Sequence, residues 1–234
     1  MNEAEEIAKA IQESAKLGKE GLKIANKAGT FFAKVFKEPI NEISGMITDK
    51  LRFLRWKRMV QMADEVNMIL KEKKIKDTRA VPPKIALPII EEASLEDDPN
   101  LQNLWNHLLA NAMNPKFNDE LRYGFIEMIK GITGIEARLL NEFYDALHRE
   151  GKLRPLIDVL QHSLKKENII QTLGLSTDAY AISVNNLMRM QLLYPAFLKT
   201  DGVKIMSAPL TTYKGYDAVT LTPLGVKFVE ACVK

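Results

Sequence analysis

The strongest hydrophobic pattern in the chain lies between residues 101 and 112, where apolar side chains recur every three or four positions. This spacing places them on one face of an amphipathic helix. Asp98 followed by Pro99 favours a helix start, since Asp caps helix N-termini and Pro fits the first position. Asn114-Pro115 stops the same helix. We therefore predict a helix from Pro99 with Trp105 buried on its apolar face.

The segment before this helix carries two kinds of break. Pro82 and Pro83 separate it from the preceding part of the chain, and Pro83 can open a short helix through Ile90. We expect Pro88 to end or kink that helix. Five acidic residues between 91 and 98 then predict a solvated connection.

The other face of the 99–113 helix carries a polar stripe. Asn103, His107 and Asn111 follow one another at four-residue steps, although Asn is a poor helix former. One interpretation is a hydrogen-bonding interaction surface for a ligand or partner. The other, which we favour, is a solvated face that ends in a C-terminal cap.

The first 80 residues predict a basic helical arm. The pattern indicates one helix over 2–17 and a longer one from Pro39 toward Ile75. Residues 19–37 interleave Lys with Phe and aliphatic side chains, which suits an anionic membrane surface or a partner groove, but we favour packing of the Phe side in the core. One interpretation of the basic cluster in the long helix is phosphate binding, and the other, which we favour, is a solvated face beside a core stripe or half of a helical hairpin. The cluster comprises Lys50, Arg52, Arg55, Lys57 and Arg58.

The second half of the chain alternates helix and strand patterns. Helices are expected over 121–129, 134–149 and 153–164. Two further helices, over 168–173 and 177–190, flank a turn at Gly174. A strand pattern through Met206, a return strand over 218–221 and a final helix opening at Thr222-Pro223 complete the order of a winged helix.

The predicted fold is therefore mainly α. A helical arm (1–80) and a helical central domain (81–134) precede a winged-helix-like domain (135–234) with a small β-hairpin. The would-be recognition helix offers Asn185, Asn186 and Arg189 as candidate nucleic-acid contacts, but it begins with Asp178. Since Lys and Arg supply most affinity for DNA, we favour a structural or protein-binding role for this module.

Charge is unevenly distributed along the chain, although the net charge is only +3. The net charges are +5 for residues 1–80, −6 for 81–150 and +4 for 151–234. This alternation either steers an anionic partner to one end or lets the ends pack on the middle. The single cysteine, Cys232, and the absence of a signal-peptide or membrane-span pattern predict a cytoplasmic protein.

The sequence contains no recognisable catalytic or metal-binding motif. His107, His148 and His162 are far apart, and no P-loop, H-E-x-x-H or G-x-S-x-G pattern occurs. Cys232 lies in an apolar helix, which favours a packed thiol over a nucleophile. We expect no catalytic residues, no metal and no cofactor, and hence a protein that is not an enzyme.

Three segments together resemble the bacterial Abi-alpha (abortive infection alpha) family. They are PPKIALPIIEEASLEDDPNLQNLWNHLLANAMN at 82–114, FIEMIKGITGIEARLL at 125–140 and LTPLGVKFVEAC at 221–232. The resemblance extends over about residues 40–234 and implies antiviral defence, by a phage-encoded or chromosomal protein that limits phage propagation. The family has no established catalytic residues to transfer.

The leading hypothesis is a non-enzymatic defence protein that acts through contacts with a phage or host protein. A winged-helix DNA-binding regulator and a membrane-surface effector using residues 19–37 are the alternatives. A homo-oligomer formed through the long N-terminal helix is a further expectation about partners.

Overall fold

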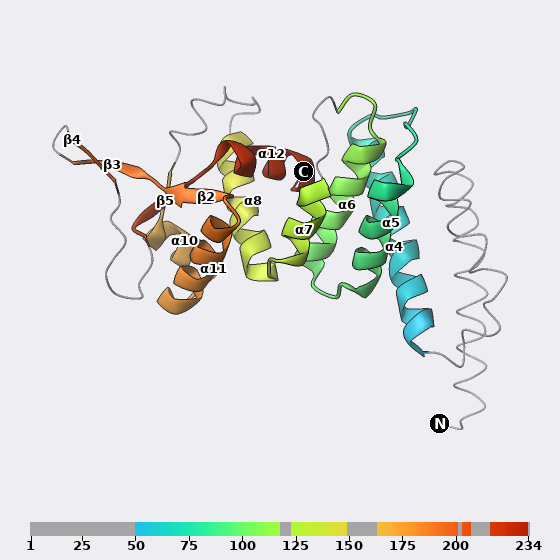
Figure 1. Cartoon of the computed structure of the whole chain (residues 1–234), viewed down its shortest axis with the longest axis horizontal. Coiled ribbons are helices and arrows are strands. Elements are labelled where there is room, and N and C mark those ends of the chain that lie inside the picture. The colour runs from blue at the N-terminus through green and yellow to red at the C-terminus, as the bar shows by residue number, and fades with distance from the viewer. Residues whose placement is uncertain (1–49, 118–122, 149–162, 201–202, 207–215, 234) are drawn as a thin grey trace. The chain divides into compact units, whose positions relative to one another are not determined.

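The computed structural model describes residues 50–117, 123–148, 163–200, 203–206 and 216–233. Within these ranges the protein is mainly helical with a small antiparallel sheet, as predicted (Figure 1). The helices are α4 (Lys50–Glu72), α5 (Pro83–Leu95), α6 (Pro99–Met113), α7 (Tyr123–Lys130), α8 (Gly134–His148), α10 (Lys166–Leu173), α11 (Thr177–Arg189) and α12 (Pro223–Cys232). The strands are β1 (Leu164–Lys165), β2 (Leu193–Pro195), β3 (Phe197–Thr200), β4 (Val203–Met206) and β5 (Ala218–Leu221).

The chain forms two compact units. The first comprises residues up to Asp97 together with 105–118, and the second comprises 98–104 together with 119–234. Helix α6 therefore contributes residues 99–104 to the second unit and residues 105–113 to the first.

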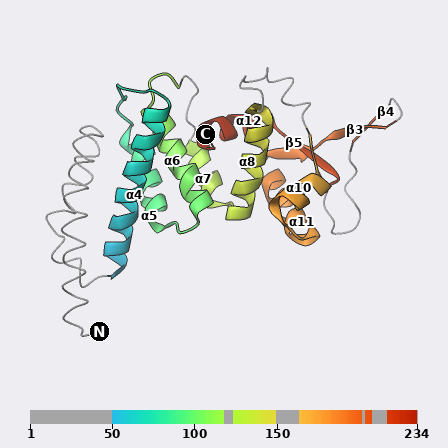
Figure 2. The same cartoon turned by 180° about the vertical axis from the view of Figure 1, so that it is seen from behind.

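The first unit is built on α4, α5 and the larger part of α6, which run side by side (Figures 1 and 2). Their facing sides supply its core, because apolar residues recur at helical spacing along each of them. The buried side chains include Trp56, Val60, Met62, Ala63, Val66, Ile89, Ile90, Trp105, Leu108 and Leu109.

Helix α5 is longer than the sequence predicted. It continues through Pro88 and takes in residues 91–95, so the expected break at Pro88 and the expected connection from residue 91 are wrong. Ala93 and Ser94 are buried in this added turn. Their packing against the rest of the unit outweighs the helical hydrogen bond that a proline in the sixth position removes.

Helix α6 is buried on every side from Leu104 to its end at Met113. It begins where predicted, since the Asp98 carboxylate accepts from the backbone N–H of Asn100 (2.7 Å) and of Leu101 (3.3 Å). Trp105 is 2% exposed, which confirms its predicted burial. The favoured prediction of a solvated opposite face is wrong, because His107 and Asn111 are also buried.

The second unit combines helices with a three-stranded antiparallel sheet in the order β1-β5-β2. Leu164 pairs with Val219, and Leu193 pairs with Leu221, so β5 lies between the other two strands. Phe125 of α7 meets Phe228 of α12 edge to face, with ring centroids 5.5 Å apart. The two rings contribute aromatic packing to the core of this unit.

Most of the predicted elements of this unit lie where the sequence placed them. Helices α10 and α11, strand β5 and helix α12 follow the predicted order. The strand pattern through Met206 is not one strand, however: β3 and β4 pair with each other as an antiparallel hairpin, Phe197 opposite Met206. Leu164, the last residue of the predicted 153–164 helix, belongs to β1 instead.

Several predictions fall on residues outside the described ranges. These are the helix over 2–17, the basic segment 19–37, the beginning of the long helix at Pro39, and residues 153–162. The winged-helix assignment and the three-part division of the chain also stay predictions.

Candidate functional site

The candidate nucleic-acid contacts on α11 have different surroundings. The amide nitrogen of Asn186 donates to the backbone carbonyl of Gly131 (3.0 Å) and to the carboxylate of Glu136 (2.9 Å). The guanidinium of Arg189 donates twice to the amide oxygen of Asn186, at 2.8 and 3.2 Å. Asn185 is exposed. Two of the three residues therefore take part in a hydrogen-bond network within the second unit.

Glu136 is the centre of this network, and sequence reasoning missed it. Its side chain is buried, and one carboxylate oxygen accepts from the backbone N–H of Thr133 at 2.6 Å. This contact is one half of a helix N-terminal capping box, the motif that the T-x-x-E spacing indicates. Through Asn186, the cap of α8 holds α11 against the turn that follows α7.

The basic cluster of α4 is partly engaged with α5. The guanidinium of Arg55 donates to the hydroxyl of Ser94 (3.1 Å), and that of Arg58 donates to the backbone carbonyl of Leu95 (2.9 Å). Cations at this position stabilise the negative end of a helix. Lys57 is exposed, whereas the side chains of Lys50 and Arg52 lie outside the described residues. Two members of the predicted anionic-binding surface therefore have a structural role at the end of α5.

Of the three residues in the polar stripe of α6, Asn103 is half-exposed, whereas His107 and Asn111 are buried. The amide oxygen of Asn111 accepts a 2.8 Å hydrogen bond from the Lys73 ammonium. Burial lowers the pKa of Lys73. Arg79 adds a second contact, since its side chain donates to the carbonyl of Ala112 at 2.8 Å. The structure places His107 and Asn111 inside the fold rather than on an open face.

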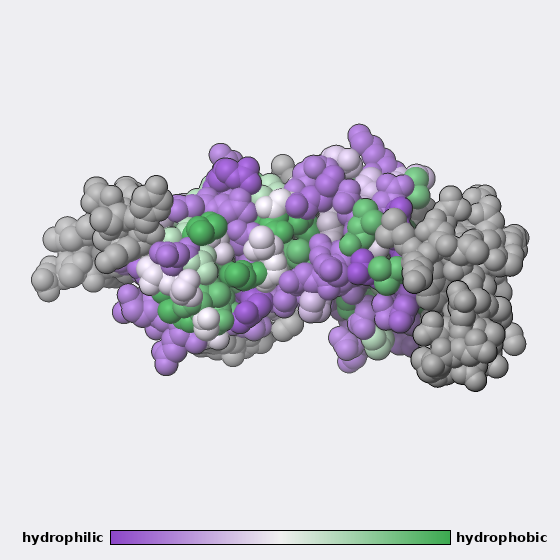
Figure 3. Space-filling model, turned by 90° about the horizontal axis from the view of Figure 1, so that it is seen from below, coloured by the Kyte–Doolittle hydropathy of each residue, from purple (hydrophilic) through white to green (hydrophobic). Residues whose placement is uncertain are grey.

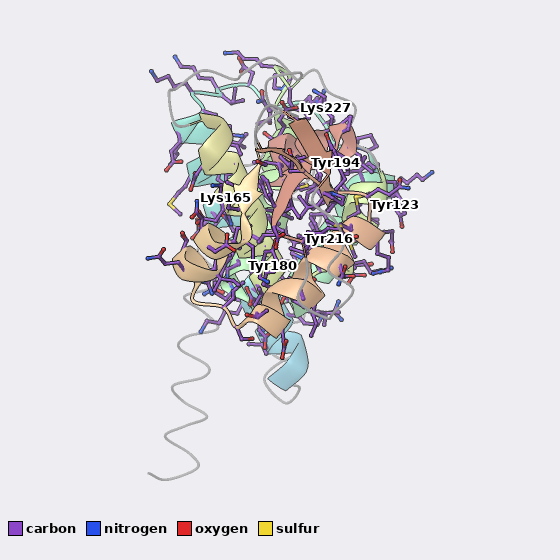
Figure 4. All side chains as sticks on the ribbon, turned by 90° about the vertical axis from the view of Figure 1, so that its left-hand side faces the viewer. Tyr123, Lys165, Tyr180, Tyr194, Tyr216 and Lys227 are labelled. Atoms are coloured by element: carbon purple, nitrogen blue, oxygen red, sulfur yellow. The ribbon has the colours of Figure 1, made fainter. Side chains whose placement is uncertain are left out.

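Tyr180 is a buried titratable group on the opposite side of α11 from its exposed residues. Its hydroxyl donates to the backbone carbonyl of Tyr216 at 2.7 Å, and the two tyrosines lie close together in Figure 4. The Lys166 ammonium lies 5.9 Å from the centre of its ring. Burial, followed by the negative charges of Asp217 and Glu167, raises the pKa of Tyr180.

The described residues contain no cluster of three or more His, Cys, Asp or Glu side chains with the arrangement of a metal site. Cys232 is fully buried, and burial raises the pKa of its thiol. Such a thiol is poorly ionised and unreactive at neutral pH. Among the described helices, none combines the length and apolar character needed to cross a bilayer.

Comparison with known families adds a decisive observation. The model of the family described as abortive infection alpha matches residues 55–232, which is most of the chain. The chain belongs to this family. The match includes all three segments that suggested the resemblance, and it begins within α4. No curated protein and no solved structure matches the chain.

Proposed function

We propose that this member of the abortive infection alpha family is an antiviral defence protein that limits phage propagation through contacts with a phage or host protein. The family match over residues 55–232 is the observation that carries the proposal. It spans both compact units and ends within the last helix, so it rests on the fold as a whole and not on one motif.

The chemistry of the described residues favours contacts over catalysis as the mode of action. Polar and charged side chains that stood out in the sequence, among them Arg55, Arg58 and Asn186, stabilise helix ends or bridge helices. The cysteine is buried in the last helix. These residues build a scaffold, and we infer that it acts by presenting surfaces to a partner.

Plating a diverse phage panel on cells that express the protein tests the defence role. We expect reduced plating efficiency for at least one phage, compared with cells carrying the empty vector. In an abortive mechanism, liquid cultures survive infection at a low phage-to-cell ratio but collapse at a high ratio, since infected cells die without releasing phage. Full plating of every phage in the panel would contradict the proposal.

A DNA-binding regulator is the competing function, and the order of α10, α11 and the sheet is the observation that favours it. Fluorescence anisotropy with duplex DNA at physiological salt separates the two functions. Asn185→Ala is the sharpest variant, because Asn185 is exposed and Asn186 and Arg189 also serve the fold. Sequence-selective binding that this variant loses would establish the regulator and displace protein contacts as the mode of action.

A further inference from the structure

One face of α11 is exposed along its whole length. Asp178, Ile182, Asn185 and Arg189 are all exposed, and their spacing of four, three and four residues aligns them in one stripe. Ile182 is 69% exposed, more than any other large apolar side chain among the described residues. Figure 3 shows patches of apolar residues on the surface of the second unit. We call these four residues the α11 stripe.

The α11 stripe is complementary to itself. Its order is acid, aliphatic, amide, base, and the spacing is the same when counted from either end. When two copies of α11 pack antiparallel about a two-fold axis, Asp178 of each copy faces Arg189 of the other. Ile182 of each copy then packs beside Asn185 of the other at the centre. Isologous contacts of this kind are the commonest way in which soluble proteins form dimers.

We propose that the α11 stripe is a homodimerisation surface, and that its partner is a second copy of this chain in antiparallel orientation. An exposed isoleucine at the centre supplies apolar burial, and the two ion pairs at the ends fix the orientation. A duplex DNA partner is disfavoured, because the stripe begins with an acid that would meet phosphate. The contact is a single helix face, smaller than a standard interface, so the dimer is weak and depends on protein concentration.

Sedimentation velocity over a wide concentration range tests this proposal with charge swaps. Asp178→Arg makes both ends of the interface repulsive and should weaken dimerisation about tenfold, and Arg189→Asp should do the same. The double variant, D178R with R189D, restores both ion pairs and should dimerise like the parent. An equimolar mixture of the two single variants should form heterodimers, because each then faces the opposite charge.

Two further variants separate the interface from other effects. Ile182→Asp should raise the dissociation constant at least about tenfold, the effect typical of removing a central anchor. Glu167→Arg is the matched control: it makes the same charge change in the first turn of α10, away from the α11 stripe, and should dimerise like the parent. Thermal melts followed by circular dichroism show that each variant is folded, which matters most for Arg189→Asp because Arg189 contacts Asn186.

The proposal is overturned if the parent protein remains monomeric at every concentration. It is equally overturned if a dimer forms that neither Ile182→Asp nor Asp178→Arg weakens, since the interface then lies elsewhere. Failure of the folded double variant to recover dimerisation would exclude the antiparallel arrangement. These measurements do not depend on phage protection, so dimerisation and the proposed defence function are tested separately.

Discussion

At the scale of single residues, polar side chains inside this protein act as connectors between helices. Arg55 links α4 to α5, Lys73 links the end of α4 to α6, and Asn186 links α11 to the start of α8. Each of these hydrogen bonds has one charged partner, and removing either side chain leaves the other group partly buried and unsatisfied. Truncating such a connector therefore costs more than truncating a solvated side chain.

The Lys73–Asn111 pair gives the first prediction. Asn111→Ala removes the oxygen that accepts from the half-buried Lys73 ammonium, and we expect it to lower the free energy of unfolding by about 1–3 kcal/mol. Asn103→Ala is the control on the same stripe, where the side chain is half-exposed, and should change stability by less than about 0.5 kcal/mol. Urea titration followed by circular dichroism measures both. Equal stability of the two variants would show that Asn111 is not a connector.

The buried tyrosine of α11 gives a prediction about pH. Tyr180→Phe removes the hydrogen bond to the Tyr216 carbonyl and should lower stability at neutral pH by about 1 kcal/mol. Because burial raises the folded-state pKa of Tyr180, its contribution is fully present below pH 10. Above pH 10 the tyrosine ionises in the unfolded state while it stays protonated in the folded state, so ionisation lowers the free energy of the unfolded parent, an effect that the phenylalanine variant lacks.

The stability difference between the parent and Tyr180→Phe should therefore narrow as the pH rises above 10. Urea unfolding at neutral pH and at a pH just above 10 measures this difference. Tyr180→Phe keeps the aromatic ring and therefore its packing, so the comparison tests the contribution of the hydroxyl alone. A difference that stays constant across this range would mean that the Tyr180 hydroxyl ionises alike in both states.

At the scale of elements, helix ends decide where helices start and how they meet their neighbours. Ser176 caps α11 by accepting from the Ala179 N–H (3.1 Å), and Thr222 caps α12 by accepting from the Gly225 N–H (2.8 Å). The backbone N–H of Thr222 also donates to the carbonyl of Leu192 at 3.0 Å. The start of α12 is thereby held against the turn between α11 and β2, and Gly225 permits this close approach.

A pair of glycine substitutions tests that close approach. A β-carbon at Gly225 would overlap the backbone carbonyl of Leu192, so Gly225→Ala should destabilise the protein by about 1–3 kcal/mol. Gly124 is exposed in α7 and has open space around it, so Gly124→Ala should instead stabilise by up to about 1 kcal/mol. Thermal melts of the two variants should move in opposite directions. A Gly225→Ala protein as stable as the parent would contradict the close packing of α12.

At the scale of the whole molecule, α6 is a helix whose residues are divided between the two compact units. Its residues from 104 to 113 are all buried, including the aromatic Trp105. A helix buried on every side depends on the packing of its neighbours and contributes to theirs in return. A cavity in α6 should therefore have a larger effect than the same change at the surface.

Trp105→Ala makes that cavity and should lower the free energy of unfolding by about 3–5 kcal/mol. Trp56, the other tryptophan, is buried in α4 and reports on the first unit by fluorescence in this variant. Both the fluorescence and the circular dichroism transitions should shift to lower urea concentration. Leu87→Ala on the exposed side of α5 is the control. A Trp105→Ala protein that unfolds at the same urea concentration as the parent would contradict the proposal that packing around α6 stabilises the fold.

Local signals in the sequence were sufficient to place most helices. Asp98-Pro99 marks the start of α6, Thr222-Pro223 marks the start of α12, and Gly174, at a φ of 64°, ends α10. Each signal acts through the backbone of the residues next to it, so it has the same effect in any fold. The sequence also predicted the burial of Trp105, from the helical spacing of apolar residues, and the family, from the three segments that resemble it.

Tertiary structure decided which polar residues are solvated and which are internal. A helical pattern identifies an apolar face, but it does not show whether a second layer covers the polar face, as happens to His107 and Asn111. For the same reason α5 continues through Pro88, and Arg55, Arg58 and Asn186 belong to the scaffold. These outcomes depend on partners distant in the chain, whose approach is set by the packing of whole helices and not by their neighbours in sequence.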